Sequence, residues 1–417
     1  MIGAAMERTL DVYIDWQGKT IHIGRLWARS KGSKETSSFE YMDEWRAHPR
    51  TFALDPMLPL TAGAFHTEGL FNAFTDPAPD RWGRNLLLRR ERKQAKSEGR
   101  PARTLVDIDF LTLVEDENRS GALRFTEAGD ATFLAKAEQA IPPIISLAKL
   151  LSATTRILQD NESDDDLRLV LAPGASLGGA RPKAVVIDAD GRLSIAKFPS
   201  PNDDWPVPRW EATAMSLARA AGIDVPDFAL NIVQDRPVFL MRRFDRDEAG
   251  RRIPFISALT ALAASDGEVR SYLELLDLLR TDGAAPERDA AQLWRRMVFN
   301  ILISNTDDHL RNHGYIRDEG GWLLAPAYDL NPMPVDVKPR HHALTLDEAD
   351  DASSIDTAMA VAGQFGIKPD KARTIAAEVG SAVLAWRKVA AQNGLTNAQI
   401  ERMASAFDHE DLAKSIA

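Results

Sequence analysis

Two acidic residues and an asparagine in the last third of the chain have the types and spacing of a phosphoryl-transfer site. Asp307 and Asn312 form an Asp-x-x-x-x-Asn pattern directly after a long apolar helical pattern. In kinases the Asp of this pattern accepts the proton of an attacking hydroxyl, and the Asn oxygen binds Mg²⁺. Asp329 follows a short apolar segment and offers the second oxygen ligand that this hard cation needs. These residues predict transfer of a phosphoryl group from ATP.

A glycine-rich segment, residues 173–183, lies upstream of these acidic residues. It immediately precedes two short strand patterns joined through Asp190-Gly191, which is a strong hairpin signal. Backbone rich in glycine approaches phosphates closely and donates its N–H groups to them. We therefore expect this segment to lie beside the phosphates of the nucleotide.

A lysine on the second strand of this hairpin is expected to face inward. Lys197 follows Leu193 and Ile195 at a spacing of two, so all three side chains project from one face. A lysine buried in this way needs a partner, because burial of an unpaired charge is costly. ATP phosphates and Glu211, near the start of the next helix, are the expected partners, as in kinases.

The elements that must position these residues are rich in strands in the first half of the chain. Residues 10–23 alternate apolar and polar side chains around Gln17-Gly18, which is typical of a hairpin. Residues 110–114 and 121–125 are predicted as short strands. The apolar strand 238–241 runs into Arg242, where a hinge between two lobes would expose its backbone to adenine.

Helical patterns dominate after Met241, for example in residues 290–304. This order predicts an α+β, two-lobed, protein-kinase-like fold with a β-rich N-terminal half and an all-helical C-terminal half. The expected domains are a small N-terminal subdomain (1–110), an N-lobe with the glycine-rich loop (111–241) and a helical C-lobe with the catalytic loop (242–417).

Composition limits the class of protein. The net charge of −10 argues against a protein that coats nucleic acid, although the basic stretch 84–103 could be either a solvated helix face or a docking surface. The absence of cysteine excludes disulfides and thiolate zinc sites. Without a long apolar run or an apolar signal segment, the chain is expected to be cytoplasmic.

The assembled motifs resemble those of the HipA family of bacterial toxin kinases. The most specific match is the stretch Asn305-Thr306-Asp307-Asp308-His309-Leu310-Arg311-Asn312, followed by Pro326-Ala327-Tyr328-Asp329. Three further matches are Ser176-Leu177-Gly178-Gly179-Ala180-Arg181-Pro182-Lys183, Lys197-Phe198-Pro199 and Arg243-Phe244-Asp245-Arg246. The N-terminal hairpin and residues 70–88 are similar to the N-terminal subdomain of the family.

The resemblance implies a role for each matched residue. Asp307 would be the catalytic base, Asn312 and Asp329 the Mg²⁺ ligands, Lys197 the phosphate lysine and Ser176 an autophosphorylation site. The implied nucleotide-binding residues are Ser176, Gly178, Gly179, Lys183, Lys197, Glu211, Met241, Arg242, Phe244, His309, Asn312 and Asp329. The implied protein substrate is an aminoacyl-tRNA synthetase, and the implied partner is a helix-turn-helix antitoxin dimer through which the protein would reach DNA.

Three alternatives share some of these features. A zinc hydrolase could use His309 and His313, which have the i, i+4 spacing of ligands on a helix, but a strand beginning at residue 314 would separate them. A small-molecule kinase would use the same phosphate chemistry with another acceptor. A catalytically silent protein that binds an antitoxin and regulates DNA would have no need of Lys197, Asp307, Asn312 and Asp329 together.

Overall fold

The computed structural model describes residues 6–135, 141–171, 179–347, 352 and 354–417. These residues form two compact units. The first comprises Met1–Pro201 with Asp245–Ile256, and the second comprises Asn202–Phe244 with Ser257–Ala417. None of the helices in the described ranges is long and apolar enough to cross a bilayer.

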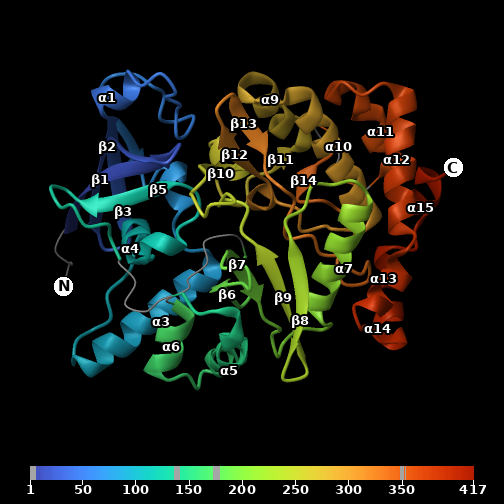
Figure 1. Cartoon of the computed structure of the whole chain (residues 1–417), viewed down its shortest axis with the longest axis horizontal. Coiled ribbons are helices and arrows are strands. Elements are labelled where there is room, and N and C mark those ends of the chain that lie inside the picture. Colours follow the sequence, from blue (N-terminus) through green and yellow to red (C-terminus); the bar gives the residue numbers. More distant parts are fainter. Residues whose placement is uncertain (1–5, 136–140, 172–178, 348–351, 353) are drawn as a thin grey trace. The chain divides into compact units, whose positions relative to one another are not determined.

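The first unit contains a five-stranded antiparallel sheet in the order β4-β3-β2-β1-β5 (Figure 1). Its strands are β1 (Met6–Trp16), β2 (Lys19–Lys31), β3 (Lys34–Tyr41), β4 (Phe65–Glu68) and β5 (Leu123–Glu127). The predicted N-terminal hairpin is confirmed, because Trp16 pairs with Lys19 around Gln17 and Gly18. Both turn residues have positive φ, as a tight turn between twisted strands requires.

The rest of the first unit is mostly helical. Its helices are α1 (Asp43–Arg46), α2 (Asn72–Thr75), α3 (Arg81–Ser97), α4 (Asp107–Leu113), α5 (Leu147–Leu158) and α6 (Asp164–Leu171). The predicted hairpin around Asp190-Gly191 is confirmed as β6 (Lys183–Ile187) and β7 (Leu193–Lys197), which pair antiparallel. The segment predicted as a strand at 110–114 instead ends helix α4. The Asp109 carboxylate accepts from Val106 N at 3.1 Å, and Glu35 accepts from Asp107 N and Ile108 N, so the first turn of this helix is capped.

The second unit begins with α7 (Val207–Ala220) and the hairpin β8 (Phe228–Val233) and β9 (Arg236–Arg242). Its central helix, α10 (Pro286–Leu302), packs against α9 (Tyr272–Asp282), α11 (Ile355–Val361) and α12 (Pro369–Val383) (Figure 1). The remaining helices are α8 (Ala258–Ala261), α13 (Trp386–Gln392), α14 (Asn397–Arg402) and α15 (Glu410–Ser415). Stacking of Trp386 on Phe407, with centroids 4.5 Å apart, and the neighbouring Trp210 fill the core beside α7.

The α+β class is confirmed, but the C-terminal half is not all helical. It contains an antiparallel hairpin of β12 (Gly314–Asp318) and β13 (Gly321–Leu324) and the short parallel pair β11 (Arg270–Ser271) and β14 (Leu344–Thr345). A further strand, β10 (Phe255–Ser257), spans the sequence boundary between the units. The β12–β13 turn depends on Gly321, whose φ is 151° and whose added Cβ would lie 2.5 Å from the Asp282 carbonyl oxygen. The tripartite division into 1–110, 111–241 and 242–417 stays a prediction.

Candidate active site

The second unit carries two adjacent aspartates with opposite environments in the loop of residues 303–313, which follows α10. The Asp307 side chain is 70% exposed, whereas the Asp308 side chain is 2% exposed. The loop turns sharply at its start, because Ser304 has a φ of 51° and Asn305 N donates to Asn300 O. Asp307 can therefore meet a substrate, and Asp308 is available to anchor the loop.

Asp308 is the centre of a buried network beneath Asp307. Tyr272 donates its hydroxyl to Asp308, and His313 Nε2 lies 3.0 Å from each carboxylate oxygen. Burial alone would raise the pKa of Asp308, but His313 and the Tyr272 hydroxyl hold it below its ordinary value. His313, which we considered as a zinc ligand, is thus committed to this carboxylate. The sequence analysis missed the role of Asp308, although its position beside Asp307 was visible.

Asn312 presents a buried oxygen near Asp307. Its Nδ2 donates to the Asp307 carbonyl oxygen at 2.9 Å, which fixes the amide. Within the described residues its Oδ1 is buried and has no hydrogen-bond partner. Leaving such an oxygen unsatisfied is costly, and an oxygen of this kind suits a hard divalent cation. The donor set therefore fits Mg²⁺ better than a metal that prefers nitrogen or sulfur.

Asp329 lies on the segment that follows β13. It has a φ of 58°, an uncommon conformation for a residue with a side chain, and Asn331 Nδ2 donates to its Oδ1 at 3.2 Å. Tyr328 donates its hydroxyl to the Arg311 carbonyl oxygen at 2.8 Å. This bond ties the residue before Asp329 to the residue before Asn312, so the two proposed metal ligands lie on segments that are fastened together.

The predicted hinge and helix residues also lie in the second unit. Phe244 stacks on Tyr328 with ring centroids 5.4 Å apart, and Arg242 Nη1 lies 3.2 Å from Asp227 Oδ2. Met241 is buried in β9, and Glu211 is buried in α7, which packs against β9. His309 accepts from Asn312 N through its carbonyl oxygen at 2.8 Å, so it shapes the 303–313 loop.

The first unit carries the predicted phosphate lysine. Lys197 is buried at the end of β7 and lies opposite Lys183 on β6 in the register of the hairpin. The burial that its spacing predicted is confirmed. Ser176 and Gly178 fall outside the described residues. Gly179, the last predicted glycine of the segment, has a φ of 87°.

Lys183 makes a buried ion pair that the sequence analysis did not anticipate. Its Nζ lies 2.6 Å from Asp80 Oδ2 and donates to the Gly179 carbonyl oxygen at 3.2 Å. Asp80 also caps α3 by accepting from Gly83 N, and Trp82 Nε1 donates to the Lys183 carbonyl oxygen. The start of β6, the end of the glycine-rich segment and the N-terminus of α3 are therefore joined at one point.

Five of the eight basic side chains in the stretch 84–103 are paired with acidic residues of the first unit. The ion pairs are Arg84–Asp107, Arg89–Asp160, Lys93–Asp164, Arg100–Glu91 and Arg103–Asp109. Charges matched in this way attract phosphate backbones less than a free basic face would. Of the two readings of this stretch, the structure favours the solvated helix face.

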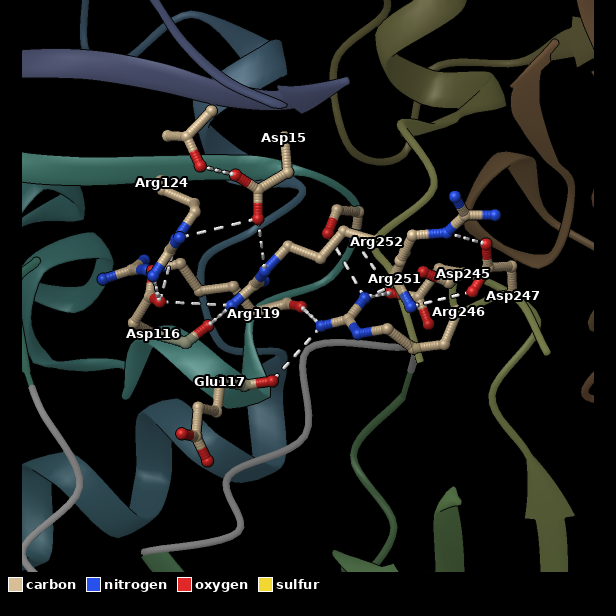
Figure 2. Close-up of polar contacts among 12 residues, drawn as sticks. Asp15, Asp116, Glu117, Arg119, Arg124, Asp245, Arg246, Asp247, Arg251 and Arg252 are labelled. Carbon is tan, nitrogen blue, oxygen red and sulfur yellow. Dashed lines mark hydrogen bonds and ion pairs between the residues drawn. The ribbon is translucent and has the colours of Figure 1, made fainter. Parts of the chain in front are cut away.

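Residues 245–256, which follow Phe244 in sequence, are fastened to the first unit by a network of charges (Figure 2). Arg246 donates to Asp245 and to the carbonyl oxygens of Glu117 and Arg119. Arg252 and Arg124 both pair with Asp116 and Asp15. Burial lowers the pKa of Arg119 to about 9. The network gives the segment after the predicted hinge a fixed place in the first unit.

We expect His342 to make the second unit less stable in acid. Burial, together with the positive charge of Arg340, lowers the pKa of His342 to about 4, against the raising effect of Asp308. In the unfolded chain this imidazole has a pKa near 6.5, so as the pH falls it is protonated in the unfolded state before it is protonated in the folded state. Protonation of His342 is therefore expected to lower the unfolding free energy by about 3 kcal/mol as the pH falls from 7 to 4.

Urea unfolding of the wild type and of His342→Gln at several pH values measures this loss. The variant should show a flatter pH dependence over this window, and His66→Gln, at an exposed position on β4, should follow the wild type. Identical pH dependence in the wild type and His342→Gln would contradict the assignment.

Family models match most of the chain. Residues 10–105 match the model described as the HipA N-terminal domain, and residues 175–386 match the HipA-like C-terminal domain. Y4mE of Sinorhizobium fredii, a protein named provisionally as a kinase, is 30% identical over 182 residues. Toxin YjjJ of Escherichia coli is 26% identical over 170 residues. These alignments cover 37% and 38% of this chain, and the chain spans only 41% and 38% of the two relatives.

A solved structure extends the similarity to nearly the whole chain. It is HipA of Shewanella oneidensis in a complex with HipB and operator DNA. The match has a TM-score of 0.66 at 16% identity and covers 98% of this chain and 96% of the other. At this level of identity the likeness shows the fold.

Proposed function

This chain belongs to the HipA family, and from that premise we propose that it is an ATP- and Mg²⁺-dependent protein serine/threonine kinase. One observation carries the proposal. The exposed carboxylate of Asp307 and the Oδ1 of Asn312, which is buried and has no partner among the described residues, belong to the same loop, and Asn312 Nδ2 donates to the Asp307 carbonyl oxygen. A proton acceptor open to substrate and an oxygen suited to a cation, presented by one loop, are what hydroxyl phosphorylation needs.

Each residue then has a defined task. Asp307 accepts the proton of the attacking hydroxyl as its oxygen bonds to the γ-phosphorus and the bond to ADP breaks. Asn312 and Asp329 would hold Mg²⁺, which neutralises phosphate charge when bound. Lys197 would contact the phosphates and pair with Glu211. The backbone of Met241 and Arg242, with Phe244, would meet the adenine.

Membership of the family supports a proposal for the biological role. We infer that the chain is the toxin of a toxin–antitoxin pair, that its substrate is an aminoacyl-tRNA synthetase in the cytoplasm, and that it inhibits translation. Self-phosphorylation at Ser176 would add negative charge beside the phosphates of ATP and so disfavour nucleotide binding. The toxin name of YjjJ and the HipB–DNA complex of the Shewanella protein support a helix-turn-helix antitoxin as the partner, with DNA reached through it.

Calorimetric titration with ATP tests the metal site directly. We expect the wild type to bind ATP at least about tenfold more tightly with Mg²⁺ than with EDTA. Asn312→Ala should lose most of this difference, because removing a residue that merely orients a metal ligand commonly lowers metal affinity about 10- to 100-fold, and Asn312 is itself a proposed ligand. Asn393→Ala, which removes an amide that contacts Thr213 away from the loop, is the matched control. Equal binding with Mg²⁺ and EDTA would speak against the proposal.

A further inference from the structure

Lys338, which lies outside the 303–313 loop, contacts Thr306 and Asp307 of that loop. Lys338 Nζ donates to the Thr306 carbonyl oxygen at 3.0 Å and lies 3.9 Å from Asp307 Oδ1. Neither the Asp-x-x-x-x-Asn pattern nor the motif around Asp329 contains it. The segment that follows Asp329 therefore places the ammonium group of Lys338 beside Asp307.

The backbone around Lys338 is anchored on both sides. Val335 N donates to Ser405 Oγ at 3.1 Å, and Arg402 Nη1 lies 3.0 Å from Asp336 Oδ1. On the other side, Arg340 pairs with Asp411 at 2.6 Å and donates to the Ile301 carbonyl oxygen at 3.1 Å. The C-terminal residues 402–411 and the end of α10 thus hold this segment against the 303–313 loop.

The contact with Asp307 has little value as a stabilising ion pair. The Lys338 side chain is 42% exposed and its partner is more exposed still, and exposed pairs at such distances contribute almost nothing to folding. The bond to Thr306 uses one of the three N–H groups of the ammonium. The charge remains accessible beside the carboxylate that would receive the substrate hydroxyl.

We propose that Lys338 is a further catalytic residue, which stabilises the γ-phosphoryl group during its transfer; this inference rests on the proposed kinase function. The acceptor hydroxyl gives its proton to Asp307 and its oxygen bonds to the γ-phosphorus. The bond from that phosphorus to the bridging oxygen breaks, and its electron pair stays on ADP. Lys338 keeps its proton throughout and balances the negative charge that spreads over the equatorial phosphoryl oxygens.

The test compares Lys338→Met and Lys338→Arg with Lys414→Met. Lys414 is a matched control, because its side chain is also 42% exposed and its Nζ lies 2.7 Å from Asp356. With ATP and Mg²⁺ and no added acceptor, each full chain is expected to phosphorylate itself once, so the rate of ADP formation over a range of ATP concentrations gives the maximal single-turnover rate constant, taken as kcat, and the KM for ATP. We expect Lys338→Met to lower kcat about 10²-fold with KM changed less than about threefold. Arginine should restore at least about a tenth of the activity, since it keeps the charge, and Lys414→Met should match the wild type.

The outcomes separate this inference from the proposed function. An active wild type with Lys338→Met within twofold of its kcat would overturn the role of Lys338 alone. A parallel fall in melting temperature and kcat that arginine does not rescue would overturn it in favour of a structural role. An inactive wild type that binds no ATP would overturn the kinase proposal as well.

Discussion

Asp307→Ala is expected to lower the rate of phosphoryl transfer by about 10²- to 10⁴-fold, the usual contribution of a general base. Among the described residues, the side chain makes no buried contact that the fold depends on, since it is 70% exposed and lies 3.9 Å from Lys338 Nζ. The melting temperature of the variant should therefore stay close to that of the wild type. ADP release and self-phosphorylation measure the rate, and calorimetry measures the stability.

A matched control is available on α11. Asp356 is 69% exposed and pairs with Lys414, so Asp356→Ala removes an equivalent surface carboxylate. It should leave the rate unchanged. Equal rates for Asp307→Ala and the wild type would remove Asp307 from the mechanism, and loss of folding in Asp307→Ala would indicate a structural role instead.

The second large effect is expected on stability, at the buried pair of Asp80 and Lys183. Their side chains are 5% and 1% exposed, with the charged atoms 2.6 Å apart. Lys183→Met or Asp80→Asn leaves one buried charge without its partner, and we expect either to lower the unfolding free energy by about 3–5 kcal/mol. Urea denaturation of the single variants measures this loss.

The double variant Asp80→Asn/Lys183→Met decides whether pairing is the cause. Removing both charges should restore part of the loss, because no unpaired charge remains. Arg192→Met is the control for an ordinary ion pair, since its partner Glu248 is 87% exposed; we expect a cost below about 1 kcal/mol. If the double variant loses as much unfolding free energy as the two single variants together, the two charges are not coupled and the prediction is wrong.

The parts of the fold that local patterns determine were predictable. The turn at Gln17-Gly18, the hairpin around Asp190-Gly191 and the burial of Lys197 each follow from side-chain alternation and turn chemistry over a few residues. The segment 110–114 failed because a short apolar run suits a strand or a buried helix equally. Its first turn is capped in part by Glu35, which is more than seventy residues away and accepts from the first N–H groups of α4.

The supports of the candidate site were not predictable from spacing. Asp80 and Lys183 are 103 residues apart, so no local pattern connects them. Asp307 and Asp308 are adjacent, and only the turn at Ser304 and the positions of Tyr272 and His313 decide which carboxylate is buried. Lys338 approaches Asp307 because distant residues hold its segment. Sequence motifs predicted the reacting groups, and the tertiary structure revealed what orients them.

Intact-mass spectrometry of the purified chain after incubation with ATP and Mg²⁺, with Asp307→Ala alongside, tests the kinase proposal most directly. We expect the wild type to gain the mass of one phosphate, located at Ser176 by peptide mapping, and Asp307→Ala to gain none. No gain of mass in the wild type, together with no detectable binding of ATP, would contradict the proposal.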